Sequence, residues 1–236
     1  MTQPTHAWMR LACLAAALSI SGCADMPSLP SLTSRVLDAG PGSGPLVCED
    51  KVSAIEGTRL TAIEQLLDDD KPYAALAQLD GNAAPGLRAR YLRAESLRRV
   101  GQFDAAQMAY QSLLGTCLKG QAHHGWGLMA ARQGQLQTAL THLRQARTAL
   151  PTDARVRNDL GYALLLANEL PDARTEFLTA LDLQPGDARA ARNLVVLAFR
   201  QGQDAQAEKL ARRFGLDAGL IAALRQQAQA LPAFTS

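Results

Sequence analysis

Several features that would point to other protein classes are scarce in this 236-residue sequence. The formal net charge is only +2, from 24 basic and 22 acidic side chains, which argues against nucleic acid as a partner. Runs of strand-favouring residues are almost absent. Beyond residue 22, no stretch approaches the ~20 apolar residues of a transmembrane helix. We therefore expect a mainly helical protein that does not bind nucleic acid and has no transmembrane helix beyond residue 22.

Catalytic and metal-binding motifs are missing as well. The sequence contains no Walker-type loop, no G-x-S-x-G, no CxxC and no HExxH. Its histidines beyond residue 22 are His123, His124 and His142, and the adjacent pair faces different sides of one helix, which makes a poor metal site. We therefore expect no enzymatic activity, no cofactor and no metal site.

The first 22 residues have the pattern of an export signal that ends at a cysteine. Arg10 is followed by ten uncharged residues, Leu11 to Ile20, a hydrophobic region of signal-peptide length. The stretch "ISGC", Ile20 to Cys23, resembles the bacterial lipobox. This resemblance implies that residues 1–22 are removed and that Cys23 is lipidated, with a plain signal peptide as the alternative. Ala24 after the cysteine favours the periplasmic side of the outer membrane, while Asp25 leaves inner-membrane retention open.

Two cysteines remain after the lipidation site, Cys48 and Cys117. In an oxidising periplasm a disulfide between them is the default expectation, and two unreacted buried thiols are the alternative. The disulfide would close a loop of about 70 residues, which contributes about 4 kcal/mol in the chain-entropy model.

A tether precedes the folded part. Residues 23–46 include "ADMPSLPSLTSRVLDAGPGSGP", which is rich in Pro, Gly and Ser and poor in large apolar side chains. Such a segment cannot bury enough apolar surface to fold, so we expect a disordered tether that spans roughly 25 Å.

Most of the remaining chain repeats with a spacing of 34 residues. The shift of 34 relates Trp126-Gly127 to Leu160-Gly161, Ala139 to Ala173, Leu143 to Phe177, Ala146 to Ala180 and Pro151 to Pro185. Small residues such as Gly127 and Ala139 mark where two helix backbones approach closely. The prolines end helices, and Asp153 and Asp187 are placed as N-caps of the helices that follow.

This pattern resembles the tetratricopeptide repeat (TPR), a 34-residue helix–turn–helix. The resemblance implies an all-α superhelical solenoid of about four to five helix pairs with a C-terminal capping helix. We expect a degenerate helix pair in residues 47–86, TPR repeats in 87–215, and a capping helix and tail in 216–236. An irregular helical bundle is the alternative.

The TPR resemblance also implies a concave face lined by the first helix of each pair. The residues of this sequence expected to form a partner-binding groove there are Tyr91, Arg98, His124, Arg132, Asn158, Tyr162, Arg189, Arg192, Asn193 and Phe199. Arginines suit carboxylates, asparagines suit backbone amides, and aromatic rings supply buried area, so the groove fits a peptide segment with acidic and apolar side chains. A basic helix surface that merely keeps the chain soluble is the alternative.

A lipobox, a tether and a TPR array in one short chain resemble the TadD lipoproteins of tight-adherence (Flp) pilus systems. The resemblance implies a protein-interaction scaffold in pilus assembly, with a pilotin-like role toward the pilus secretin. The competing interpretations are a general envelope adaptor, for peptidoglycan enzymes or outer-membrane protein assembly, and a structural subunit of a secretion or pilus complex.

Overall fold

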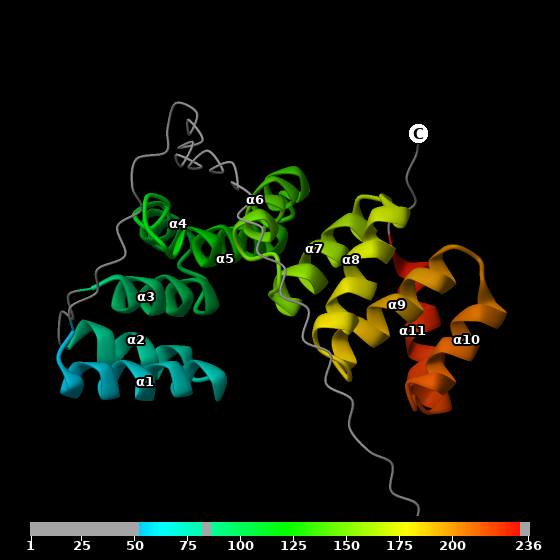
Figure 1. Cartoon of the computed structure of the whole chain (residues 1–236), viewed down its shortest axis with the longest axis horizontal. Helices are drawn as coiled ribbons and strands as arrows, with labels where there is room; N and C mark the ends of the chain where they lie inside the picture. The colour runs from blue at the N-terminus through cyan, green and yellow to red at the C-terminus, as the bar shows by residue number, and fades with distance from the viewer. Residues whose placement is uncertain (1–51, 82–85, 232–236) are drawn as a thin grey trace, which may run out of the picture. The chain divides into compact units, whose positions relative to one another are not determined.

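A computed structural model describes residues 52–81 and 86–231 of the chain (Figure 1). This part contains eleven α-helices and no β-strand, so the predicted all-α class is confirmed. The helices are α1 (Ala54–Asp68), α2 (Pro72–Asp80), α3 (Leu87–Arg99), α4 (Phe103–Gln111), α5 (Lys119–Arg132), α6 (Leu136–Ala149), α7 (Ala154–Leu166), α8 (Leu170–Leu183), α9 (Ala188–Arg200), α10 (Asp204–Arg213) and α11 (Ala218–Ala230).

The helices pack in the order of the sequence. Successive helices form the pairs α1–α2, α3–α4, α5–α6, α7–α8 and α9–α10, and from α2 to α9 the second helix of one pair packs on the first helix of the next. The first helices of successive pairs also contact one another, and α11 packs on α9. This local stacking is the predicted solenoid of helix pairs with a capping helix, as Figure 1 lets the reader follow.

The turn inside each pair has the same left-handed residue. The φ angles are 84° at Gly101, 74° at Gly134 and 69° at Gly202, and two non-glycine residues, Asp70 at 56° and Asn168 at 60°, take this place in the other pairs. Asparagine and aspartate tolerate this conformation better than other side chains. The shared turn shows that α1 and α2, whose sequence is degenerate, are built like the later pairs.

Aspartates begin two of the helices, as the sequence predicts. The Asp153 carboxylate accepts hydrogen bonds from the backbone N–H groups of Arg155 and Val156 at 2.9 and 3.3 Å. Asp187, one repeat later, accepts from the first turn of α9 in the same way. Each cap satisfies N–H groups that have no partner inside the helix, and thereby fixes where α7 and α9 start.

Small residues allow the helices of a pair to approach closely. A Cβ atom built on Gly161 would lie 2.7 Å from Cε1 of Phe177, and one built on Gly127 would lie 2.7 Å from Cγ of Leu143. Phe177 and Leu143 are themselves buried in the core. The predicted close approach of α5 to α6 and of α7 to α8 is therefore confirmed.

A buried carboxylate joins three helices. Glu176 on α8 is only 3% exposed. Its carboxylate accepts from the guanidinium of Arg147 on α6 at 2.8 Å and from that of Arg157 on α7 at 3.0 Å. Because a buried charge is costly without partners, this cluster fixes the second helix of one pair against the next pair.

Candidate functional site

A cavity of about 670 Å³ lies between α5, α7, α9 and α11. It is lined by side chains from the first helices of three successive pairs and from the capping helix. Six of the predicted groove residues are among them: Arg132, Asn158, Tyr162, Arg189, Arg192 and Asn193. The structure thus brings together residues that are up to about two repeats apart in the sequence.

A row of hydrogen-bonded polar side chains runs along the cavity wall from α5 to α9. His124 Nε2 lies 2.7 Å from a carboxylate oxygen of Asp159, and the second oxygen of Asp159 accepts from Asn158 Nδ2 at 3.1 Å. Asn193 Nδ2 in turn donates to Asn158 Oδ1 at 2.9 Å. Asn158 is 4% exposed, so its amide is held in one orientation by these bonds. Asn193 is half-buried and keeps its carbonyl oxygen for another donor.

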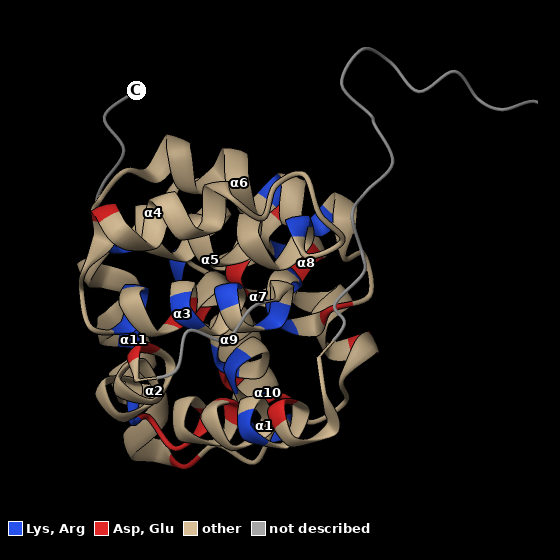
Figure 2. Cartoon of the chain, turned by 90° about the vertical axis from the view of Figure 1, so that its left-hand side faces the viewer, with Lys and Arg blue, Asp and Glu red and all other residues tan. Residues whose placement is uncertain are grey.

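Three arginines border the cavity. Arg189 and Arg192 extend from the start of α9, and both are exposed. Arg132 ends α5, and its guanidinium carbon lies 5.6 Å from the centre of the Phe103 ring. The one carboxylate of the lining, Asp159, is engaged by His124, so the arginines give the cavity a positive rim. Figure 2 shows basic positions on α7 and α9, the helices that carry much of this lining.

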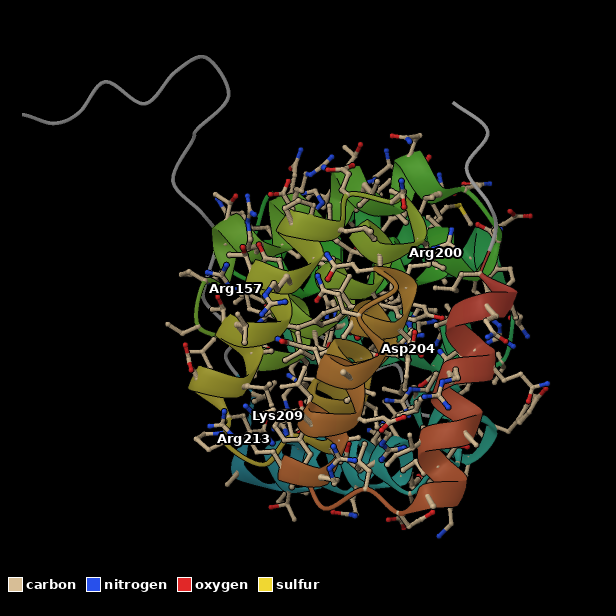
Figure 3. The ribbon with its side chains drawn as sticks, turned by 90° about the vertical axis from the view of Figure 1, so that its right-hand side faces the viewer. Arg157, Arg200, Asp204, Lys209 and Arg213 are labelled. Atoms are coloured by element: carbon tan, nitrogen blue, oxygen red, sulfur yellow. The ribbon has the colours of Figure 1, made fainter. Side chains whose placement is uncertain are left out.

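The capping helix closes one side of the cavity with apolar side chains. Leu220, Ala223 and Leu224 of α11 contribute to the lining. Leu224 and Ala228 pack α11 on α9, and the Arg225 guanidinium adds contacts to α10, with Asp204 at 3.1 Å and Glu208 at 2.7 Å. Figure 3 shows Asp204 at the start of α10, where that helix lies beside α11.

Two predicted groove residues are part of the interior of the α3–α4 pair. Tyr91 is half-buried and packs against the core clusters on both sides of α3, and burial raises the pKa of its hydroxyl. Arg98 donates to the buried Glu95 at 2.6 Å and to the Tyr110 hydroxyl at 3.2 Å. Burial alone would raise the pKa of Glu95, but the charge of Arg98 overcomes it and lowers that pKa. Neither side chain lines the cavity.

His124 and Phe199 also differ from their expected placement. His124 does not line the cavity itself, but it contacts Asp159, which does. Phe199 is 8% exposed and lies in the core, with the Arg225 guanidinium 4.7 Å from its ring centre. The Phe199 ring is largely covered by α11 and Arg225, and its role in binding a partner stays a prediction.

The apolar wall on α11 was not foreseen from the sequence. The sequence predicts only a capping helix and tail in residues 216–236. A signal is present, since Leu220, Leu224 and Ala228 recur every four residues and so share one face of a helix. The spacing indicates a buried face but does not say that part of it borders a cavity.

The predicted cysteine sites are mostly outside the described residues. Cys23 and Cys48 lie in the segment before residue 52, and Cys117 is exposed in the turn between α4 and α5. Lipidation of Cys23 and the disulfide between Cys48 and Cys117 stay predictions. Among the helices of residues 52–81 and 86–231, none is both long and apolar enough to cross a membrane.

Sequence comparison supplies the family context. The sequence model of the tetratricopeptide repeat family matches residues 91–154, 124–188 and 158–220, which together span more than half of the chain. The TPR repeat-containing protein PA4299 of Pseudomonas aeruginosa is 37% identical over 216 residues, which cover 92% of this chain and 82% of that protein. The matched model describes a helical repeat and not a catalytic domain.

Solved structures share the fold at low sequence identity. Pilf of Pseudomonas aeruginosa superposes with a TM-score of 0.58 at 16% identity, covering 74% of this chain and 86% of its own. MamA of Desulfovibrio magneticus RS-1 gives 0.53 at 19% identity, with 74% and 97% covered. YrrB, described as a TPR protein with an unusual peptide-binding site, gives 0.53 at 19% identity, with 71% and 90% covered.

Proposed function

The chain belongs to the tetratricopeptide repeat family, and from this premise we propose that it is a scaffold whose protein partner docks in the cavity between α5, α7, α9 and α11. The observation that carries the proposal is the composition of the cavity. A positive rim, a row of hydrogen-bonded amides and an apolar wall lie together there, and the rim is not part of the packing between helices. Exposed Arg189 and Arg192 in particular contribute little to the core.

The chemistry of the cavity indicates the kind of segment that fits. Guanidinium groups bind carboxylates with two parallel hydrogen bonds, so Arg189 and Arg192 suit Asp, Glu or a terminal carboxylate. The free carbonyl of Asn193 can accept from a backbone N–H of the bound segment. An apolar side chain can pack against Leu220 and Leu224. The expected ligand is therefore a short acidic segment with at least one large apolar residue.

The cellular setting in this proposal comes from the sequence. The lipobox resemblance supports a lipid anchor at Cys23, which would hold the protein at the outer membrane, facing the periplasm. The resemblance to TadD lipoproteins supports a role in Flp pilus assembly, with a segment of the pilus secretin as the partner. Anchoring at the membrane would raise the local concentration of the docking cavity for a partner in the same membrane.

Matched charge reversals test the docking cavity. The double variant Arg189→Glu and Arg192→Glu reverses two charges at the rim, whereas Lys209→Glu and Arg213→Glu reverses two charges on α10, on the side away from α11 (Figure 3). Both variants have the same net charge. We expect cross-linked capture from envelopes of the native host to fall about tenfold or more in the first variant only, because a lost carboxylate contact costs at least ~1.4 kcal/mol.

The outcomes separate the interpretations. Equal loss in both double variants would mean that general charge attraction, and not the cavity, captures the partner. Unchanged capture in the rim variant would refute the cavity as the docking site. Mass spectrometry of the captured proteins distinguishes a secretin or pilus component from peptidoglycan enzymes or barrel-assembly proteins, which would instead support a general envelope adaptor. Cys23→Ala should abolish piliation while the fold stays intact, and normal piliation would refute the tethering step.

A further inference from the structure

Two histidines from the two helices of one pair meet ring to ring. His123 on α5 and His142 on α6 place their Nδ1 atoms 2.9 Å apart, with ring centres separated by 5.2 Å. His124, the neighbour of His123, points the other way toward Asp159 on α7. The contact is therefore specific to one face of α5, and it is separate from the docking cavity.

The His142 ring is held in place by its surroundings. The Trp126 ring stacks on it with centres 4.2 Å apart and planes 17° apart. One residue after Trp126, the close approach of Gly127 to Leu143 fixes α5 against α6. Both histidines are only half-buried, and a cavity of about 380 Å³ borders His123. The site thus has one imidazole stacked on Trp126, and a second imidazole that borders a cavity large enough for water.

We propose that His123 and His142 form a binding site for a divalent transition-metal ion that prefers imidazole ligands and square-planar or octahedral geometry, such as Ni²⁺ or Cu²⁺. Neutral imidazoles at an Nδ1···Nδ1 distance of 2.9 Å share one proton. An ion can take the place of that proton when the donating ring changes tautomer, so that its proton moves from Nδ1 to Nε2 by exchange with water; both neutral rings then offer an Nδ1 lone pair to the metal. Two nitrogens in adjacent positions of a square-planar or octahedral ion, each bonded at 2.0–2.1 Å, are about 2.9 Å apart.

The site would be open and exchangeable. Nowhere in residues 52–81 and 86–231 does a group of three or more His, Cys, Asp or Glu side chains gather as ligands would. Water therefore completes the coordination, as in sites that keep open positions, and the ion is not needed to fold the chain. Such a site suits reversible binding of a metal ion from the surroundings of the protein.

Trp126 gives a direct readout, because Ni²⁺ quenches the fluorescence of a nearby indole. The chain has two tryptophans, and Trp8 lies in the expected signal peptide, so either the mature chain or the full chain with Trp8→Phe leaves Trp126 as the only tryptophan. Titration with Ni²⁺ should quench it with 1:1 saturation, and calorimetry should give the same affinity. His123→Gln keeps the stack of Trp126 on His142, and we expect it to weaken Ni²⁺ binding by about tenfold or more.

His124→Gln is the matched control, since it removes a histidine of the same helix that faces elsewhere. It should leave the Ni²⁺ affinity unchanged. Equal weakening in His123→Gln and His124→Gln, or no weakening in either His123→Gln or His142→Gln, would overturn the proposal. Thermal unfolding of each variant without metal checks that the helix pair still forms, so that a loss of binding reports on the ligands.

Discussion

Adding one methyl group at Gly161 tests whether close helix approach requires a glycine there. In Gly161→Ala the new Cβ would lie 2.7 Å from Cε1 and 2.8 Å from Cδ1 of Phe177, which is 0% exposed and has no room to rotate. Overpacking of this kind costs about 1–3 kcal/mol. The same change also removes the unfavourable helix propensity of glycine, a gain of about 1 kcal/mol that must be separated from the steric cost.

Gly57→Ala separates the two effects. Gly57 lies in α1, and a Cβ built on it has no atom within 4 Å. We expect this variant to raise the free energy of unfolding by about 0.5–1 kcal/mol, since only propensity changes. The difference between the two variants in urea unfolding, followed by circular dichroism, should then equal the steric cost of about 1–3 kcal/mol.

A double-mutant cycle completes the test. Phe177→Leu removes the ring atoms that the new methyl group would meet, so Gly161→Ala should be far less harmful in that background, with a coupling of about 0.5–3 kcal/mol. If Gly161→Ala stabilises the protein as much as Gly57→Ala, or if no coupling to Phe177 is found, then glycine is not required by the packing of α7 on α8.

Three further perturbations follow from single contacts. Glu176→Gln leaves Arg147 and Arg157 without their charged partner. It should lower the free energy of unfolding, measured in urea, by about 2 kcal/mol. An unchanged free energy would mean that the cluster does not stabilise the fold. Burial, followed by the charge of His123, lowers the pKa of His142 from 6.5 to about 4. The His142 ring is therefore protonated at a lower pH in the folded state than in the unfolded state. Stability should therefore fall as the pH drops from 6.5 to 4, by on the order of 1 kcal/mol after solvent screening, and this step should be absent in chelator-treated His142→Gln. Asp187→Ala removes the N-cap of α9 and should cost about 1 kcal/mol in thermal unfolding, whereas no loss would mean that water caps the helix equally well.

The repeat architecture could be predicted from the sequence because its determinants are local. A 34-residue spacing of small and large apolar residues sets where two helices of a pair touch, as at Gly161 and Phe177. Asp153 and Asp187 begin helices through bonds to backbone groups only two or three residues away. Such contacts depend on spacing within about one repeat, so the residue pattern by itself determines them.

The candidate site was predicted only in part. Asn158 and Asn193 were assigned to one face because they occupy related repeat positions, and the structure joins them by a hydrogen bond. Phe199 occupies a position of the same kind, yet α11 covers it. The repeat pattern gives the direction of a side chain from its own helix, but it does not say which other helix lies over that side chain.

Tertiary structure alone decided the remaining features. The apolar wall on α11 exists because the buried side of α11, which includes Leu224 and Ala228, packs on α9 and thereby brings Leu220 and Leu224 to the cavity. The 34-residue pattern does not encode that contact, since α11 is not part of a repeat. In this chain the sequence determined the helix pairs and their stacking through short-range spacing. The packing of non-equivalent helices, set by particular side chains in three dimensions, decided which surfaces stay open to a partner.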